Sequence, residues 1–180
     1  MYSFRRTSAL AAVGVVITAL VSGCGETKVA QCNKLIKVIN QGQPIVAEFQ
    51  QESIKASSSL ASTSKPSAVQ QQATQSATVL NKFASDWDKH NQEIKAVELA
   101  DEKLIGFQKR YFQSGEQLGQ GMREMSQTMT DFSKIKVTPG SLDKLQKISS
   151  SFTTISQKLG SVDQESSKVV TELNSYCSGS

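Results

Sequence analysis

Histidine, tryptophan and proline are scarce in this 180-residue chain, which has one His, one Trp and three Pro, and its aromatic content is only 6%. A single His cannot supply a bis-histidine haem site or a zinc site built from several imidazoles. The GxSxG, HExxH and phosphate-loop motifs of hydrolases and nucleotide-binding enzymes are missing as well. These absences predict no catalytic residue, no metal centre and no cofactor, so we do not expect an enzyme.

Long apolar runs are also missing, apart from one near the N-terminus. Residues 9–21 carry no charge and follow Arg5 and Arg6, but a helix needs about 20 apolar residues to cross a bilayer comfortably. A short cationic start, an apolar stretch and then small residues are typical of a secretory signal. The stretch ends in Val21-Ser22-Gly23-Cys24, which resembles the lipobox of bacterial lipoprotein precursors, although most lipoboxes have Leu in place of Val21.

This resemblance implies that residues 1–23 are removed, that Cys24 carries lipid, and that residues 24–180 form the single mature domain. Two or three acyl chains hold a protein stably at a membrane, whereas one chain does not. Gly25 stands where Asp would signal retention at the inner membrane. The resemblance therefore implies an exported lipoprotein on the periplasmic or outer-membrane side. The alternative is an uncleaved N-terminal anchor with an incidental Cys.

The basic character of the chain depends partly on its first residues. Removing residues 1–23 takes away Arg5 and Arg6 but no acid, so the formal net charge falls from +4 to +2. Nucleic-acid binding depends on many cationic contacts with phosphates. We therefore expect no nucleic-acid partner.

The remaining sequence has the periodicity of long helices. Apolar residues recur every three or four positions from Cys32 to Tyr176, which favours helices packed at shallow angles over alternating strands. The abundant Ser (26 residues) and Gln (18 residues) suit the exposed faces of such helices. We expect helices near 26–57, 66–97, 101–136 and 139–177. Their boundaries rest on the Ser-rich residues 57–64 before Pro66, on Asp101 as a helix cap, and on Thr138 before Pro139.

Short connections between these helices favour antiparallel neighbours. The expected fold is an all-α, antiparallel up-down-up-down four-helix bundle of long helices. No proline separates Pro66 from Val137, so the alternative is a three-helix rod with one very long central helix. Gly42 and Pro44 interrupt the first helix without changing its heptad register, and we expect a proline kink there rather than a loop.

Cys32 and Cys177 remain after Cys24 is lipidated. An exported protein meets an oxidising compartment, where two thiols usually form a disulfide. In an up-down-up-down bundle the first helix begins where the fourth helix ends. We therefore expect a Cys32–Cys177 disulfide, with two separate buried thiols as the alternative.

Aromatic side chains of the second and third helices provide one candidate site. Antiparallel pairing brings them to one level of the bundle, close to the Gly42–Pro44 kink. A kink beside aromatic rings favours a small apolar pocket or a docking surface. A tightly packed aromatic layer is the alternative. The residues of this level are Phe83, Trp87, Phe107, Tyr111 and Phe112.

Three further features of these helices need an interpretation. Met122, Met125 and Met129 lie on one helix face, where they are weak candidates for a Cu(I) site, although the same spacing suits core packing. We expect the lone His90 to be paired with a neighbour or to face solvent. Glycines within the third helix permit close packing, a bulge or flexibility, and they are Gly115, Gly119 and Gly121.

We interpret the chain as a lipid-anchored, extracytoplasmic helical-bundle lipoprotein that acts by binding, as an accessory or scaffold for a membrane-associated protein partner. The alternative is a carrier of a small apolar ligand or of Cu(I), and a third possibility is a spacer lipoprotein with no specific ligand. In architecture alone the expected bundle is similar to the helical-bundle lipoproteins of the cyanobacterial thylakoid lumen that assist photosystem II. That similarity implies a thylakoid-lumen location if the chain is cyanobacterial.

Overall fold

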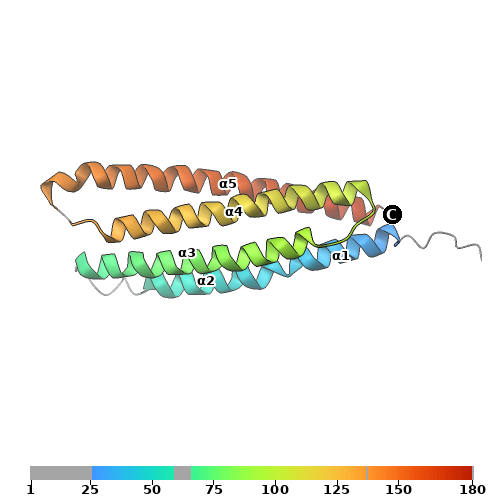
Figure 1. The fold of residues 1–180 in the computed structure, drawn as a ribbon, viewed down its shortest axis with the longest axis horizontal. Helices are drawn as coiled ribbons and strands as arrows, with labels where there is room; N and C mark the ends of the chain where they lie inside the picture. The colour runs from blue at the N-terminus through green and yellow to red at the C-terminus, as the bar shows by residue number, and fades with distance from the viewer. Residues whose placement is uncertain (1–25, 59–65, 137, 180) are drawn as a thin grey trace, which may run out of the picture.

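The computed structural model describes residues 26–58, 66–136 and 138–179, and within these ranges the chain is helical without any strand. Helical rods lie side by side and antiparallel along one long axis (Figure 1). They are four, formed by residues 28–58, Pro66–Lys95, Glu102–Ser133 and Leu142–Ser178. The expected bundle of long helices is confirmed, and the three-helix rod is wrong. The expected signal, Cys24 and most of the Ser-rich connection lie outside the described residues. The helices are α1 (Lys28–Asn40), α2 (Gly42–Ser58), α3 (Pro66–Lys95), α4 (Glu102–Ser133), the 3-10 turn η2 (Pro139–Ser141) and α5 (Leu142–Ser178).

The turn between α3 and α4 lies where the sequence predicts it. Asp101 caps α4, because its side chain accepts hydrogen bonds from the backbone N–H groups of Lys103 (2.9 Å) and Leu104 (3.0 Å). Two glutamines from outside the turn also hold it. The Gln31 side chain accepts from the N–H of Ala100 at 2.7 Å and of Asp101 at 2.9 Å. Gln108 donates to the carbonyl of Ile94 at the end of α3 and to that of Val97 in the turn. Long-range contacts therefore support a turn whose own sequence is weakly specific.

The start of α5 differs slightly from the expectation. The helix itself begins at Leu142, after the short turn η2. The Ser141 hydroxyl accepts from the Thr138 N–H at 3.2 Å, and the Ser141 N–H donates to the Thr138 carbonyl at 2.9 Å. Thr138 is thus the N-cap of η2, as expected, and forms a capping box with Ser141.

The first rod is two helices rather than one kinked helix. α1 ends at Asn40 and α2 begins at Gly42, so Gln41 alone separates them. The Gln41 N–H turns back to the Val38 carbonyl at 3.0 Å, and Pro44 has no N–H to donate to the Asn40 carbonyl. The loss of that donor explains why the kink becomes a break. We call residues 40–44 the α1–α2 joint.

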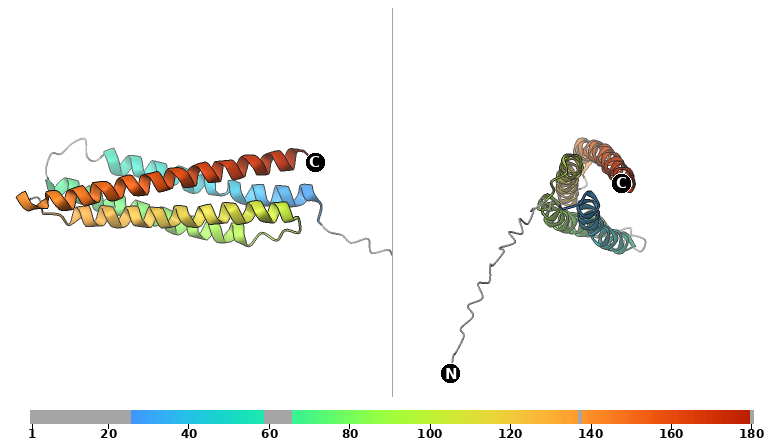
Figure 2. Two further views of the ribbon diagram at one scale, coloured as in Figure 1. Left: turned by 90° about the horizontal axis from the view of Figure 1, so that it is seen from above. Right: turned by 90° about the vertical axis from the view of Figure 1, so that its right-hand side faces the viewer.

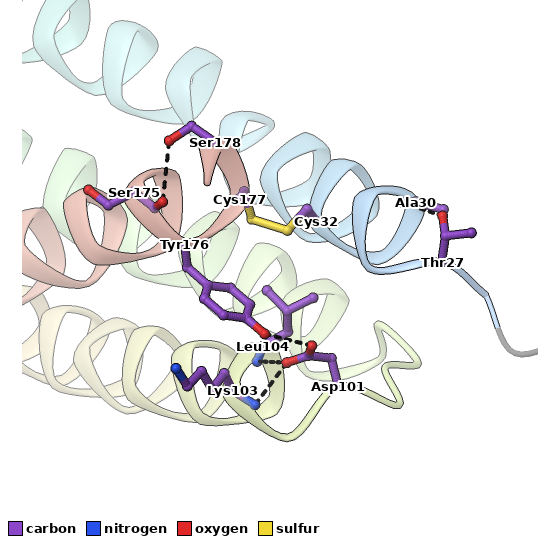
Figure 3. Close-up of a disulfide and its surroundings, with 10 residues drawn as sticks. All are labelled: Thr27, Ala30, Cys32, Asp101, Lys103, Leu104, Ser175, Tyr176, Cys177 and Ser178. Atoms are coloured by element: carbon purple, nitrogen blue, oxygen red, sulfur yellow. Dashed lines mark hydrogen bonds between the residues drawn. A yellow bond between two sulfur atoms is a disulfide. The ribbon is translucent and has the colours of Figure 1, made fainter. Parts of the chain in front are cut away.

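The core is best formed at the end of the molecule where α1 lies between α3, α4 and α5 (Figure 2). We call this the closed end. The expected disulfide is present there and joins Cys32 of α1 to Cys177 of α5, whose Cα atoms are 5.8 Å apart (Figure 3). Apolar side chains from all four rods pack around it. They are Leu35, Ile39, Ile94, Leu104, Tyr111, Val169 and Leu173.

Beyond the α1–α2 joint the bundle opens. α2 packs on α3, and α5 packs on α4, but no backbone contact joins α2 to α4 or to α5. The ion pairs follow the same order. Within the described ranges they link α2 to α3, α3 to α4, and α4 to α5, and none crosses from α2 to α5. These pairs are Glu48–Lys82, Asp88–Arg123, Glu124–Lys158, Arg110–Glu165 and Arg110–Glu172.

α3 and α4 approach each other closely at two of the glycines. A Cβ atom on Gly115 would collide with the side-chain amide of Asn91, and one on Gly119 would lie 2.7 Å from a carboxylate oxygen of Asp88. α4 continues unbroken through this region. The glycines therefore serve close packing rather than a bulge. Among the described helices, none is both long and apolar enough to cross a bilayer.

Candidate functional site

A groove runs along the open side of the bundle, between the α1–α2 rod and α5. It consists of two adjoining hollows of about 480 Å³ and about 360 Å³. Both hollows share the same four residues, one from each of α2, α3, α4 and α5. The shared residues are Val46, Trp87, Tyr111 and Val170, and the larger hollow adds Leu118 and Val162. We refer to this feature as the groove.

The walls of the groove are almost free of charge. α1 and α2 contribute amide and small side chains, and α5 contributes hydroxyls. Asp163 is the one charged residue among the lining residues of the two hollows. An apolar floor with neutral polar walls suits an uncharged or amphipathic surface better than a strongly charged ligand. The polar wall residues include Asn40, Gln43, Gln50, Ser166, Ser167 and Thr171.

Aromatic rings from α2 and α3 support the floor. The ring centroids of Phe83 and Trp87 are 5.7 Å apart, and those of Phe49 and Phe83 are 4.6 Å apart. Trp87 is 7% exposed, so its indole fills the space below the groove rather than projecting from it. Phe49 thus extends the pair of Phe83 and Trp87, which the sequence predicts to lie at one level.

Tyr111 forms the α4 side of the floor and is 8% exposed. Burial raises the pKa of its phenol, because the charged phenolate would be poorly solvated there. The side chain is therefore a neutral hydrogen-bonding group at neutral pH. Trp87 and Tyr111 therefore both line the groove beside the α1–α2 joint, and Phe83 stacks on Trp87 without lining either hollow.

Phe107 and Phe112 do not join this floor. Phe107 packs instead against Tyr176, with ring centroids 5.9 Å apart, near the disulfide. The hydroxyl of Tyr176 donates to the Asp101 carboxylate at 2.8 Å (Figure 3). Phe112 lies beneath the ammonium group of Lys95, which is 5.1 Å from the ring centroid. The expected five-residue level is therefore divided between the groove and the closed end.

His90 differs from its expected surroundings. It is 2% exposed, and neither ring nitrogen has a hydrogen-bond partner. The nearest carboxylate oxygen, on Glu93, lies 3.8 Å from Nδ1, which is too far for a hydrogen bond. Burial lowers the pKa of the imidazole below its usual 6.5, and Glu93 opposes this shift in part. His90 is therefore a buried neutral ring, neither paired nor exposed to solvent.

The three methionines are half-buried rather than fully buried. Met122, Met125 and Met129 continue the α4 face that carries Tyr111 and Leu118, because these positions recur every three or four residues. They therefore extend the open side beyond the groove. Within the described residues, no group of three or more His, Cys, Asp or Glu side chains is placed to hold a metal ion.

Sequence reasoning missed the α2 and α5 walls of the groove. Val46 belongs to the apolar repeat of the first rod, and that repeat predicted a core position, yet the residue is 36% exposed. On α5, Val162 belongs to the corresponding repeat and is buried at 4% exposure, whereas the half-buried Val170 lies next to the repeat position Val169 and outside the repeat. The one sequence feature that could have indicated these walls is their lack of charge, at Gln50 on α2 and at Ser166 and Ser167 on α5.

No protein-family model, curated protein or solved structure matches this chain.

Proposed function

We propose that the protein is a lipid-anchored, extracytoplasmic binding protein that uses the groove to hold a membrane-associated protein partner as an accessory or scaffold. The observation that supports this proposal is the missing contact between α2 and α5, which leaves apolar Val46 and Val170 lining an open surface above the buried Val162. Buried apolar surface supplies most of the free energy of association, and a groove between helices is suited to an apolar segment of a partner.

The anchor of this proposal is Cys24, which follows the signal and lipobox pattern of residues 1–24. Cys32 follows eight residues later and joins the closed end through the disulfide. A lipid on Cys24 would keep the closed end near the membrane surface, and the groove would lie farther from the membrane along the bundle. A partner in the same membrane would reach it with a segment outside the bilayer.

Site-specific photocrosslinking in the native cell tests the proposal. A photoreactive phenylalanine analogue replaces Ser166 in the groove wall or, as the matched control, Ser161, which is exposed on the same helix and lines neither hollow. We expect one protein adduct of defined mass at Ser166 and none at Ser161. The reciprocal experiment, in which the identified partner carries the photoreactive analogue, should give an adduct of the same two proteins. The mature chain should begin at a lipidated Cys24, and Cys24→Ser should abolish both lipid and adduct.

Equal crosslinking at both positions would contradict the groove as the binding site. A mature chain that retains Arg5 and Arg6 would contradict a lipid anchor at Cys24.

A second candidate function is carriage of a small apolar ligand. The larger hollow, about 480 Å³, favours it because small-molecule pockets occupy roughly 300–1,000 Å³. In that case Ser166 gives no protein adduct, and native mass spectrometry of the purified chain shows a bound small molecule.

A further inference from the structure

His90 occupies an unusual position for a titratable side chain. It is 2% exposed, and both of its ring nitrogens are buried without a hydrogen-bond partner. A buried imidazole usually has at least one partner, because an unsatisfied polar group in the interior is costly. Placing a positive charge on this ring would cost still more unless the surroundings changed. The neutral ring and the closed packing around it therefore depend on each other.

The imidazole of His90 contacts both the α1–α2 joint and Trp87. A Cβ atom added to Gly42 would lie 2.8 Å from Nε2 of His90, so the backbone of the α1–α2 joint packs directly on the imidazole. On another side the ring meets Trp87 edge to face, with centroids 5.3 Å apart. Trp87 is the floor of the groove. His90 thus connects the joint to the groove floor.

The charged surroundings of His90 are sparse. On α3, Glu93 is the charged group that acts on the ring, and its side chain is 63% exposed. From the first rod, the segment 39–47 contains no charged residue, and from α4 the segment 111–115 contains none, with Tyr111 as its one titratable group. Charges within the bundle therefore offer an imidazolium little compensation for the loss of water.

Of the segments packed around His90, the α1–α2 joint is the one that can move most easily. α3 is continuous from Pro66 to Lys95, and α1 is held at the closed end by the Cys32–Cys177 disulfide. The joint, in contrast, is a helix break in which Pro44 donates no backbone hydrogen bond. α2 beyond it packs on α3 without contacting α4 or α5. Relief of a buried charge would therefore move the joint and α2 rather than α3.

We propose that protonation of His90 is an acid switch that loosens the α1–α2 joint and rearranges the groove floor at Trp87. The switch is a property of the chain alone, and its role in regulating partner binding rests on the proposed function. The open state takes up a proton near the usual pKa of 6.5, whereas the closed state does not, because its pKa is lowered. The ratio of open to closed molecules therefore rises up to about tenfold for each pH unit below that value, until the closed state is also protonated.

The chain contains one His and one Trp, so both partners of the switch can be followed without labels. Trp87 emission and the single imidazole resonance of the purified full chain in detergent are titrated from pH 8 to pH 5. Carboxylates stay largely ionised over most of this range. We expect the emission to change with a midpoint below 6.5, together with the imidazole resonance, while far-UV circular dichroism stays constant. In His90→Gln the emission change should disappear.

Emission that stays constant while the imidazole titrates would overturn the switch, and so would an equal emission change in His90→Gln. The imidazole resonance of the wild-type chain keeps the test decisive if that variant does not fold. Crosslinking from position 166 at pH 7.5 and pH 5.5 then tests regulation, which requires a pH-dependent adduct in the wild-type chain. A coupled Trp87 and His90 transition without any adduct at either pH supports the switch and contradicts the proposed function, so the two failures are distinguishable.

Discussion

Glutamine side chains hold the ends of helices in this protein. Gln31 and Gln108 secure the turn between α3 and α4. Near the opposite end of α3, Gln70 donates to the Ile135 carbonyl and Gln72 to the Ala56 carbonyl, both at 2.8 Å. A helix end leaves backbone groups without partners, and a long neutral amide reaches them without burying a charge. Part of the high Gln content therefore has a structural role that exposed helix faces alone do not explain.

Gln31→Ala should lower the free energy of unfolding by about 1–3 kcal/mol, the usual cost of leaving buried polar groups unpaired. The Gln31 side chain is 4% exposed and accepts hydrogen bonds from two N–H groups of the turn, on Ala100 and Asp101. Chemical denaturation followed by circular dichroism measures the effect. Gln113→Ala, on the exposed face of α4, is the matched control and should change stability little. Equal midpoints for the two variants would contradict the role given to Gln31.

At the scale of single elements, α4 contains two glycines in opposite situations. The position of Cβ at Gly115 is occupied by the Asn91 amide of α3, whereas nothing lies within 4 Å of that position at Gly106. Substituting Ala at the two positions therefore compares the cost of overpacking with the gain in helix propensity within one helix. Ala is favoured over Gly in a helix interior by about 1 kcal/mol, but overpacking costs about 1–3 kcal/mol.

Gly115→Ala should therefore destabilise the protein by up to about 2 kcal/mol net of the gain in helix propensity, because the Asn91 amide, which donates to the Phe112 carbonyl, would have to move. Gly106→Ala should instead stabilise it by about 0.5–1 kcal/mol. Thermal and urea unfolding of the two variants, compared with the unchanged chain, give both values. Stabilisation by Gly115→Ala would mean that α3 and α4 do not approach as closely as described.

The elements were more predictable than their association. Periodicity predicts the four rods, and Asp101 caps α4 as expected, because both signals are local in sequence. The open side was not predicted, because a heptad repeat at Val46 indicates an apolar face without indicating which neighbour covers it. Phe112 follows Tyr111 by one residue and so points about 100° away around the helix, which removes it from the groove. The side chains and backbone that pack against His90 depend on the exact position of the break at Gln41. The sequence predicted that position only approximately.

The whole molecule combines a covalently fixed end with an open half. The disulfide closes a loop between residues separated by 145 positions, and α1 contacts α3, α4 and α5 only in that region. The other half depends on contacts between consecutive rods. The closed end should therefore be the last part of the bundle to lose structure when the disulfide is intact.

Replacing both bridging cysteines, as Cys32→Ser with Cys177→Ser, should lower the free energy of unfolding by about 4–5 kcal/mol in the chain-entropy account. Cys24 stays unchanged in this variant. Hydrogen exchange should rise most in α1 and at the end of α5, where the bridge acts. Intact mass under non-reducing conditions should show the unchanged chain to be lighter by the two hydrogens lost on oxidation. Two alkylatable thiols at Cys32 and Cys177, or exchange that rises evenly along the chain, would contradict this account.

The order in which the chain is made gives the disulfide a further consequence. Cys177 is synthesised 145 residues after Cys32, so no correct bridge can form until α2, α3, α4 and nearly all of α5 have been produced. Until then, Cys32 has no Cys177 with which to form a disulfide. A chain cut short before Cys177 retains this thiol permanently and is exposed to mispairing with other proteins. The bridge therefore distinguishes a finished chain from an incomplete one by the oxidation state of Cys32.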